Sequence, residues 1–294
     1  MTRSSILRLS DGRVLGYLEY GDPAGRPLFL CHGFLGSRLD RHPDDALTAA
    51  LGVRMIALDR PGIGLSTPQR NRDIAAWPDD IVALADSLGI NRFAVLGFSW
   101  GAPYALACAY RIPDRVSAIG LVSPMPYWIV GAGASKTLPP RFKRLSRIVQ
   151  VAPVLLYVGL WVMYLRRRRD PRGRFTAIMA RFSPQDVAAI ERVGLRPLLY
   201  DAFAEPWRQG VGGVYRDLLA VARPWRFDPR SVTAEVRLWH GAEDRIIRPA
   251  MANALADILQ CCHATVYPDE GHFVLFAHWA EILQTLTATV SAES

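Results

Sequence analysis

The sequence has few of the features that would place it outside the ordinary globular proteins. Although its net charge is +8, only two of its basic residues are lysines, Lys136 and Lys143. No stretch combines basic residues with the aromatic spacing of a base-stacking surface, so we expect no binding of nucleic acid. The N-terminus lacks a charged head followed by an apolar segment, and we therefore expect no signal peptide.

Cysteine is also scarce, and its spacing indicates neither a metal site nor a disulfide. Cys31 and Cys108 lie in apolar stretches and are predicted to be small core residues. Cys261 and Cys262 are adjacent and cannot readily bridge each other, and no Cys-x-x-Cys pair occurs. We expect reduced thiols, a cytoplasmic location and no bound metal.

Apolar segments alternate with helical patterns along most of the 294 residues, half of which are hydrophobic. This alternation predicts an α/β fold with a mostly parallel sheet covered by helices on both faces. Strands are predicted at 6–9, 13–20, 27–31, 53–58, 93–96, 116–122, 236–239 and 264–267, and helices at 79–88, 102–111, 249–259 and 278–288. The first two strands flank Asp11-Gly12, which predicts an edge hairpin.

The alternation stops between 127 and 230. We predict a core made of residues 1–126 and 231–294, with 127–230 inserted as a helical cap. Folds of this type bind ligands at the carboxyl edge of the sheet. The insertion is therefore expected to cover the site.

The longest apolar stretch, residues 148–165, is interrupted by Gln150 and Pro153. A cap helix over the site is the favoured interpretation. An interfacial segment that touches a membrane comes second, since four arginines follow at 166–169. A transmembrane span is least favoured, because it needs about 20 apolar residues. Peripheral membrane contact through 148–169 thus remains an alternative to a purely cytoplasmic location.

The run Gly97-Phe98-Ser99-Trp100-Gly101 joins a predicted strand to a predicted helix. A serine between two glycines at such a junction is typical of a nucleophile elbow. Small residues on either side let strand and helix approach closely and leave the hydroxyl accessible. The motif predicts nucleophilic attack by Ser99 on an acyl carbon.

A nucleophilic serine requires a base that a carboxylate orients. His272 follows the last predicted strand, and Asp244 follows the strand before it, so both are expected at one edge of the sheet. Glu243 is the competing acid. Less favoured competitors, too near His272 in sequence, are Asp269 and Glu270.

Acyl transfer also requires donors for the developing oxyanion, and fixed backbone N–H groups suit this role. One is expected from Trp100, after the nucleophile. The other is expected from Phe34, in the loop His32 to Gly36. His32 itself is interpreted as structural, hydrogen-bonded within its own loop.

With these segments in this order, the sequence resembles an α/β-hydrolase-fold enzyme of the capped, esterase-like branch. The resemblance extends from about residue 5 to 290, apart from the insertion. It implies an eight-stranded sheet, a triad of Ser99, Asp244 and His272, an oxyanion hole at Phe34 and Trp100, and no cofactor. The matching segments are His32-Gly33-Phe34-Leu35-Gly36-Ser37, Asp59-Arg60-Pro61-Gly62-Ile63-Gly64-Leu65-Ser66, Gly97-Phe98-Ser99-Trp100-Gly101, Gly241-Ala242-Glu243-Asp244 and Gly271-His272-Phe273.

The serine disfavours the dehalogenase and epoxide-hydrolase branches of this family, which carry aspartate at the elbow. Ser-Trp-Gly at the elbow is similar to the prolyl aminopeptidase branch. That branch has His-Gly-Gly-Pro-Gly in its oxyanion loop, where this chain has Phe34 and Leu35. Its cap would also need acids to hold an amino terminus. Glu191 and Glu205 are available, but arginine dominates the insertion.

The favoured function is hydrolysis of a carboxylic ester with an apolar acyl or alcohol group. A peptidase, a carbon–carbon bond hydrolase and a perhydrolase on the same triad are alternatives, as is a non-catalytic receptor or scaffold of the same fold. The predicted partner is a small apolar ester. The residues predicted to contact it are Leu35, Phe98, Tyr104 and Phe273.

Overall fold

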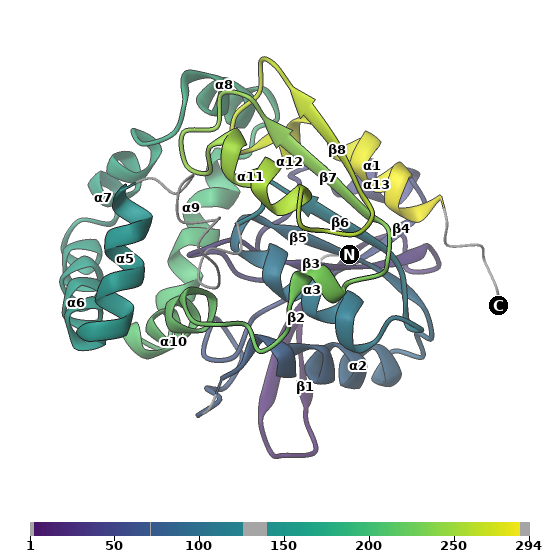
Figure 1. The fold of residues 1–294 in the computed structure, drawn as a ribbon, viewed down its shortest axis with the longest axis horizontal. Helices are drawn as coiled ribbons and strands as arrows, with labels where there is room; N and C mark the ends of the chain where they lie inside the picture. The colour runs from purple at the N-terminus through teal and green to yellow at the C-terminus, as the bar shows by residue number, and fades with distance from the viewer. Residues whose placement is uncertain (1–2, 71, 126–139, 289–294) are drawn as a thin grey trace.

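A computed structural model describes residues 3–70, 72–125 and 140–288. Its centre is an eight-stranded sheet in the order β1-β2-β4-β3-β5-β6-β7-β8 (Figure 1). Strands β3 to β8 pair in parallel, and the β1–β2 hairpin joins them antiparallel through β4. The expected α/β fold is confirmed. The strands are β1 (Arg3–Arg8), β2 (Val14–Gly21), β3 (Arg26–Cys31), β4 (Val53–Leu58), β5 (Phe93–Phe98), β6 (Val116–Val122), β7 (Val236–Gly241) and β8 (Cys262–Tyr267).

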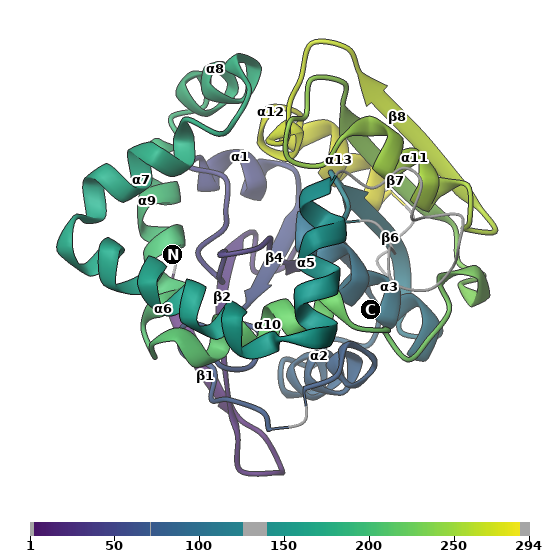
Figure 2. The same ribbon diagram turned by 60° about the vertical axis from the view of Figure 1, so that its left-hand side comes forward.

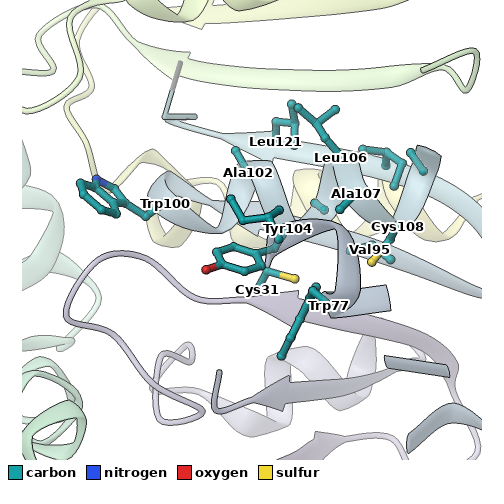
Figure 3. Close-up of a cluster of buried hydrophobic side chains, with 14 of the residues drawn as sticks. Cys31, Trp77, Val95, Trp100, Ala102, Tyr104, Leu106, Ala107, Cys108 and Leu121 are labelled. Carbon is teal, nitrogen blue, oxygen red and sulfur yellow. The ribbon is translucent and has the colours of Figure 1, made fainter. Parts of the chain in front are cut away.

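Side chains of the central strands alternate between two hydrophobic clusters, one on each face of the sheet. On β3, Phe29 and Cys31 lie in one cluster, whereas Leu28 and Leu30 lie in the other. Both faces are therefore covered by helices, as a parallel sheet requires. Figure 3 shows part of the first cluster, where helix side chains such as Tyr104 pack near Cys31.

In the part of the chain that the structure describes, six helices belong to the sheet-forming segments. They are α1 (Asp45–Ala50), α2 (Trp77–Ser87), α3 (Ala102–Arg111), α11 (Pro249–Ala256), α12 (Val274–Ala277) and α13 (Trp279–Thr287). The predicted helix at 102–111 has the predicted bounds. Helices α1 and α12 were not predicted, because stretches of six and four residues are too short for a helical period to be recognised.

Between β6 and β7, within the predicted insertion, the described residues form six more helices. Figures 1 and 2 show them gathered on one side of the sheet. Four of them begin at a proline, which suits the first helical turn because its ring fixes φ and no N–H is needed there. They are α5 (Pro140–Val151), α6 (Pro153–Arg169), α7 (Pro171–Met179), α8 (Pro184–Arg192), α9 (Arg196–Ala204) and α10 (Val211–Ala222).

The apolar stretch 148–165 is not one helix. It is divided between α5 and α6, which are bent by 116° at Ala152. Pro153 has no N–H to continue the hydrogen bonding of α5, and it starts the new helix instead. Among the described residues no single helix has the length and apolarity to cross a membrane, although this bent pair meets that criterion jointly.

A buried carboxylate on α10 ties the insertion to the core. Asp217 accepts hydrogen bonds from Arg60 at 2.7 Å, Arg72 at 2.6 Å and the Tyr104 hydroxyl at 2.9 Å. Burial alone would raise the pKa of Asp217, but the two guanidinium groups outweigh it and lower the pKa. The carboxylate is thus ionised and compensated inside the protein.

A second buried ion pair joins the two parts at another point. Arg38 Nη1 lies 2.7 Å from Asp59 in the core and 2.7 Å from Glu205, which follows α9. Removing one partner of such a pair leaves an uncompensated charge in the interior, so both pairs fix the insertion against the sheet.

Candidate active site

Ser99 occupies the sharp turn between β5 and α3. Its φ of +52° is in the left-handed region, which a non-glycine residue enters only at a cost. A Cβ on Gly97 would lie 2.8 Å from Ala102 Cα, and one on Gly101 would lie 1.9 Å from the Cys31 carbonyl oxygen. The two glycines are therefore required by the close approach of strand, turn and neighbouring loop.

A chain of hydrogen bonds leads from this serine into the core. The Ser99 hydroxyl lies 3.1 Å from His272 Nε2, and His272 Nδ1 lies 2.7 Å from Asp244 Oδ2. Asp244 Oδ1 accepts hydrogen bonds from the backbone N–H groups of Ile246 and Ile247. With Nδ1 donating to the carboxylate, Nε2 is free to accept the serine proton.

The structure distinguishes Asp244 from the acids that competed with it in the sequence. Glu243 and Asp269 are exposed, and Glu270 pairs with Arg192. Asp244 is buried and is the carboxylate bonded to the His272 ring.

The electrostatic setting favours the protonated form of His272. Burial alone would lower the pKa of the imidazole, but the charge of Asp244, the hydrogen bond to it and the nearby Asp186 together raise the pKa above 6.5. An imidazolium formed when the serine is deprotonated would therefore be stabilised in place.

Two residues that sequence reasoning missed hold the backbone on either side of the His272 ring. The Ser123 hydroxyl donates to the His272 carbonyl oxygen at 2.9 Å. Asp186, on α8 of the insertion, accepts a hydrogen bond from the Phe273 N–H at 2.8 Å. Ser183 caps the same helix and donates to the Asp186 carboxylate. The capping pattern Ser-x-x-Asp signals a helix start in the sequence, but not this long-range contact.

The loop that carries Phe34 is fixed by a fully buried arginine. Arg60 donates to the carbonyl oxygens of His32 and Gly33, and it is itself held by Asp217. His32 Nδ1 lies 2.9 Å from the Gly33 oxygen, in agreement with a structural role within its own loop. The insertion therefore reaches this loop through Arg60.

Phe34 and Trp100, the predicted oxyanion donors, lie beside Ser99. Their rings pack with centroids 4.4 Å apart, and all three residues line one cavity. The close approach of Gly101 to Cys31 and His32 brings the two backbone segments together at the elbow. Figure 3 shows the Trp100 side chain standing at the edge of the buried cluster.

The cavity above Ser99 measures about 210 Å³ and is mainly apolar. Core and insertion both contribute to its wall. The ring of Phe182, from the insertion, stacks with the His272 ring, and their centroids are 6.4 Å apart. The core side is formed by Gly33, Phe34, Leu35, Asp40, Phe98, Ser99, Trp100, Ile246, His272, Phe273 and Phe276, and the insertion side by Met163, Arg174, Ile178, Arg181, Phe182, Leu199 and Phe203.

Three of the four predicted substrate contacts, Leu35, Phe98 and Phe273, line this cavity. The fourth prediction, Tyr104, is wrong. Its side chain is buried on the other side of the elbow, where the hydroxyl donates to Asp217. Tyr104 therefore helps to anchor the insertion.

Asp40 is an unpredicted polar group in the cavity wall. Burial raises the pKa of its carboxyl to about 7, despite the backbone hydrogen bonds that lower it. Its Oδ1 atom is buried and has no hydrogen-bond partner among the described residues. A carboxyl with this pKa is partly protonated near neutral pH and can donate a hydrogen bond to a ligand oxygen.

The arrangement of the sheet and helices agrees with comparisons to known proteins. The family model of the alpha/beta hydrolase fold matches residues 26–278, so the chain belongs to this family. An esterase from Exiguobacterium antarcticum superposes with a TM-score of 0.72 over 98% of this chain and 100% of its own, at 16% identity. At that identity the likeness concerns the fold.

Two curated relatives of higher identity match shorter stretches. A proline iminopeptidase of Xylella fastidiosa is 31% identical over 159 residues, 49% of either chain. Epoxide hydrolase B of Mycobacterium tuberculosis is 36% identical over 102 residues, 33% of this chain and 28% of its own. This chain spans half or less of the length of three of the curated relatives that it matches.

Proposed function

We propose that this protein hydrolyses carboxylic esters with an apolar acyl or alcohol group, through an acyl-enzyme on Ser99. The observation that carries the proposal is the hydrogen-bonded chain from Ser99 through His272 to Asp244. Ser99 and His272, at one end of this chain, line an apolar cavity. A nucleophile, a base and an orienting carboxylate in reach of one another are the requirements of acyl transfer.

In the first half of the cycle, His272 Nε2 accepts the Ser99 proton as the oxygen attacks the ester carbonyl. The carbonyl oxygen becomes an oxyanion, which the backbone N–H groups of Phe34 and Trp100 are proposed to stabilise. His272 then gives its proton to the alkoxide that leaves, and the acyl group remains on Ser99. Asp244 stays ionised throughout and orients the ring.

In the second half, a water molecule takes the place of the alcohol. His272 accepts a proton from this water, the resulting hydroxide adds to the acyl carbon, and the serine oxygen leaves with the proton from His272. The carboxylic acid is released and Ser99 is restored. The cycle uses only groups of the chain and water.

The wall of the cavity supports an apolar substrate. Aromatic side chains from both sides surround the serine, among them Phe98, Phe182 and Phe203. Binding an apolar group there removes its surface from water, which favours binding by about 25 cal/mol per Å².

A peptidase of the proline iminopeptidase type is the second candidate, favoured by the 31% identical relative. Such a substrate carries a free amino group, which a carboxylate would have to bind. Glu205 is already paired with Arg38, and Glu191 with Arg196. Asp40 in the cavity wall has a pKa raised by burial to about 7 and is partly protonated near neutral pH. Arg174 and Arg181 line the same cavity and would repel a cation, so ester hydrolysis is preferred.

The test is a panel of p-nitrophenyl esters with acyl chains from two to sixteen carbons, with a prolyl anilide as the amide control. Turnover of esters that is lost in Ser99→Ala supports the proposal. Turnover of the anilide above that of every ester would favour the peptidase. A protein that binds apolar esters without turnover would be a receptor of the same fold.

A further inference from the structure

Helix α6 is apolar around its whole circumference, but the described structure covers only one side of it. Leu156, Leu160 and Met163 pack against other elements of the protein. A helix that is apolar all round is ordinarily buried on all sides. The opposite side of α6 is instead an apolar surface that is exposed to solvent.

That opposite side, here called the α6 outer face, consists of Val154, Leu155, Val158, Trp161 and Val162. Their side chains are between 41% and 67% exposed. At about 100° per residue they fall within roughly one third of the helix circumference. They form one continuous stripe, since the spacings are three and four residues.

The concentration is specific to this part of the molecule. Ten large hydrophobic side chains are exposed among the described residues, and seven of them lie between 151 and 162. Single exposed apolar residues are ordinary, but a contiguous group of them marks an interaction surface. Figure 1 shows α6 at the outer edge of the insertion, away from the sheet.

Positive charge follows directly at the end of the stripe. Arg166, Arg168 and Arg169 are exposed in the last turn of α6. No carboxylate of the described residues lies within salt-bridge distance of these three guanidinium groups. Their charge is thus available to an external anion.

We propose that the α6 outer face docks on the surface of an anionic lipid bilayer. The apolar stripe would lie at the boundary of headgroups and acyl chains, and the arginines would contact the lipid phosphates and other anionic headgroups. An apolar helical face combined with uncompensated basic residues is the composition that binds such surfaces. A protein partner would have to carry both an apolar groove and an acidic patch in the same register.

The other side of the same helix forms part of the cavity wall, because Met163 lines the cavity above Ser99. A docked α6 would thus separate the bilayer from the cavity by the thickness of one helix. The docking itself does not depend on the proposed ester hydrolysis and is tested without it.

The test is co-sedimentation of the full chain with vesicles of phosphatidylcholine alone and with vesicles containing one quarter phosphatidylglycerol. We expect the protein to bind the anionic vesicles, and to bind the neutral vesicles more weakly by about tenfold or more. Val154→Ser/Leu155→Ser/Val158→Ser and Arg166→Gln/Arg168→Gln/Arg169→Gln should each reduce binding at least about tenfold. The matched control is Ile6→Ser, at a residue that is 55% exposed on β1 of the hairpin and is not part of α6.

A second measurement does not depend on a multiple variant. Vesicles with brominated acyl chains should quench tryptophan fluorescence of the protein, and Trp161→Phe should remove most of that quenching. Recovery of the wild-type protein in the supernatant with both vesicles would overturn the proposal. So would equal binding by the α6 and Ile6 variants, or a dimer that is lost on substitution of α6 and does not bind vesicles.

Discussion

The core and the insertion meet the cavity with different chemistry. The core contributes Ser99, His272 and Asp244, held at 3.1 and 2.7 Å by a strained turn and by backbone hydrogen bonds. The insertion contributes mainly apolar side chains, such as Phe182 and Phe203. The hydrogen-bonded chain thus belongs to the core alone, and we expect substitutions in the insertion to change the shape of the accepted substrate and not the type of reaction.

The insertion itself differs from one side to the other. At α10 and the turn after α9 it is attached to the core by the buried charges of Asp217 and Glu205. At α6 its outer face is apolar and exposed. A rigid attachment on one side leaves the other side available for contact with a further surface.

The largest expected effect is on the core side. Ser99→Ala removes the nucleophile and should lower kcat/KM for esters by about 10⁴-fold or more, with the melting temperature preserved. Steady-state kinetics and thermal unfolding measure the two quantities. Residual turnover within tenfold of the wild type would show that the reaction does not pass through Ser99.

The attachment of the insertion should dominate stability. Asp217→Asn leaves Arg60 and Arg72 without their carboxylate, and the free energy of unfolding should fall by about 3 to 5 kcal/mol. The control is Glu191→Gln, in an ion pair with Arg196 that is half exposed, with an expected loss below about 1 kcal/mol. If a denaturant titration gave equal losses of unfolding free energy for Asp217→Asn and Glu191→Gln, the buried ion pairs would contribute no more to stability than the exposed pair.

The insertion side of the cavity should control substrate size. Phe203→Ala enlarges the cavity without touching the hydrogen-bonded chain. We expect the ratio of kcat/KM for long to short acyl esters to rise by about tenfold or more. Phe227→Leu, in the insertion but outside the cavity, should leave the ratio unchanged. An unchanged ratio in Phe203→Ala would assign chain-length preference to the core.

The smallest effect concerns Asp186, where the insertion touches the catalytic loop. The activity should fall as the pH drops through the pKa of His272, because only the neutral imidazole accepts the serine proton, and the midpoint should lie above 6.5. Asp186→Asn removes a charge that raises this pKa, so the midpoint should move to lower pH.

Asp186→Asn also weakens the hydrogen bond that Asp186 accepts from the Phe273 N–H, so we expect a modest loss of kcat. Asp201→Asn, on the exposed side of α9, serves as control for the pH profile. A midpoint that stays fixed in Asp186→Asn, or moves upward, would mean that Asp186 does not act on His272.

The sheet and the chain from Ser99 to Asp244 could be predicted from the sequence because both depend on local signals. A parallel strand is a short apolar run, and each functional residue lies in the turn or loop that follows one. The elbow was recognisable because two glycines and a serine satisfy a turn that few other residues permit. The division of the chain at 126 and 231 stays a prediction, since its first boundary lies outside the described residues.

The features that the sequence could not supply arise from packing between distant segments. Asp186 contacts the catalytic loop across 87 residues, and no local pattern contains that contact. Tyr104 was misplaced because its partner, Asp217, lies 113 residues further along the chain. The break of 148–165 was visible as Pro153, but its angle depends on the packing of α5 and α6.

One measurement tests the central claim most directly, namely that the core presents Ser99 as an activated nucleophile. The protein is treated with a fluorophosphonate, which phosphonylates activated serines, and the adduct is mapped by mass spectrometry of its peptides. We expect one adduct at Ser99, absent from Ser99→Ala and formed much more slowly in His272→Ala. An adduct at a different residue, or labelling of Ser99 at the same rate without His272, would contradict it.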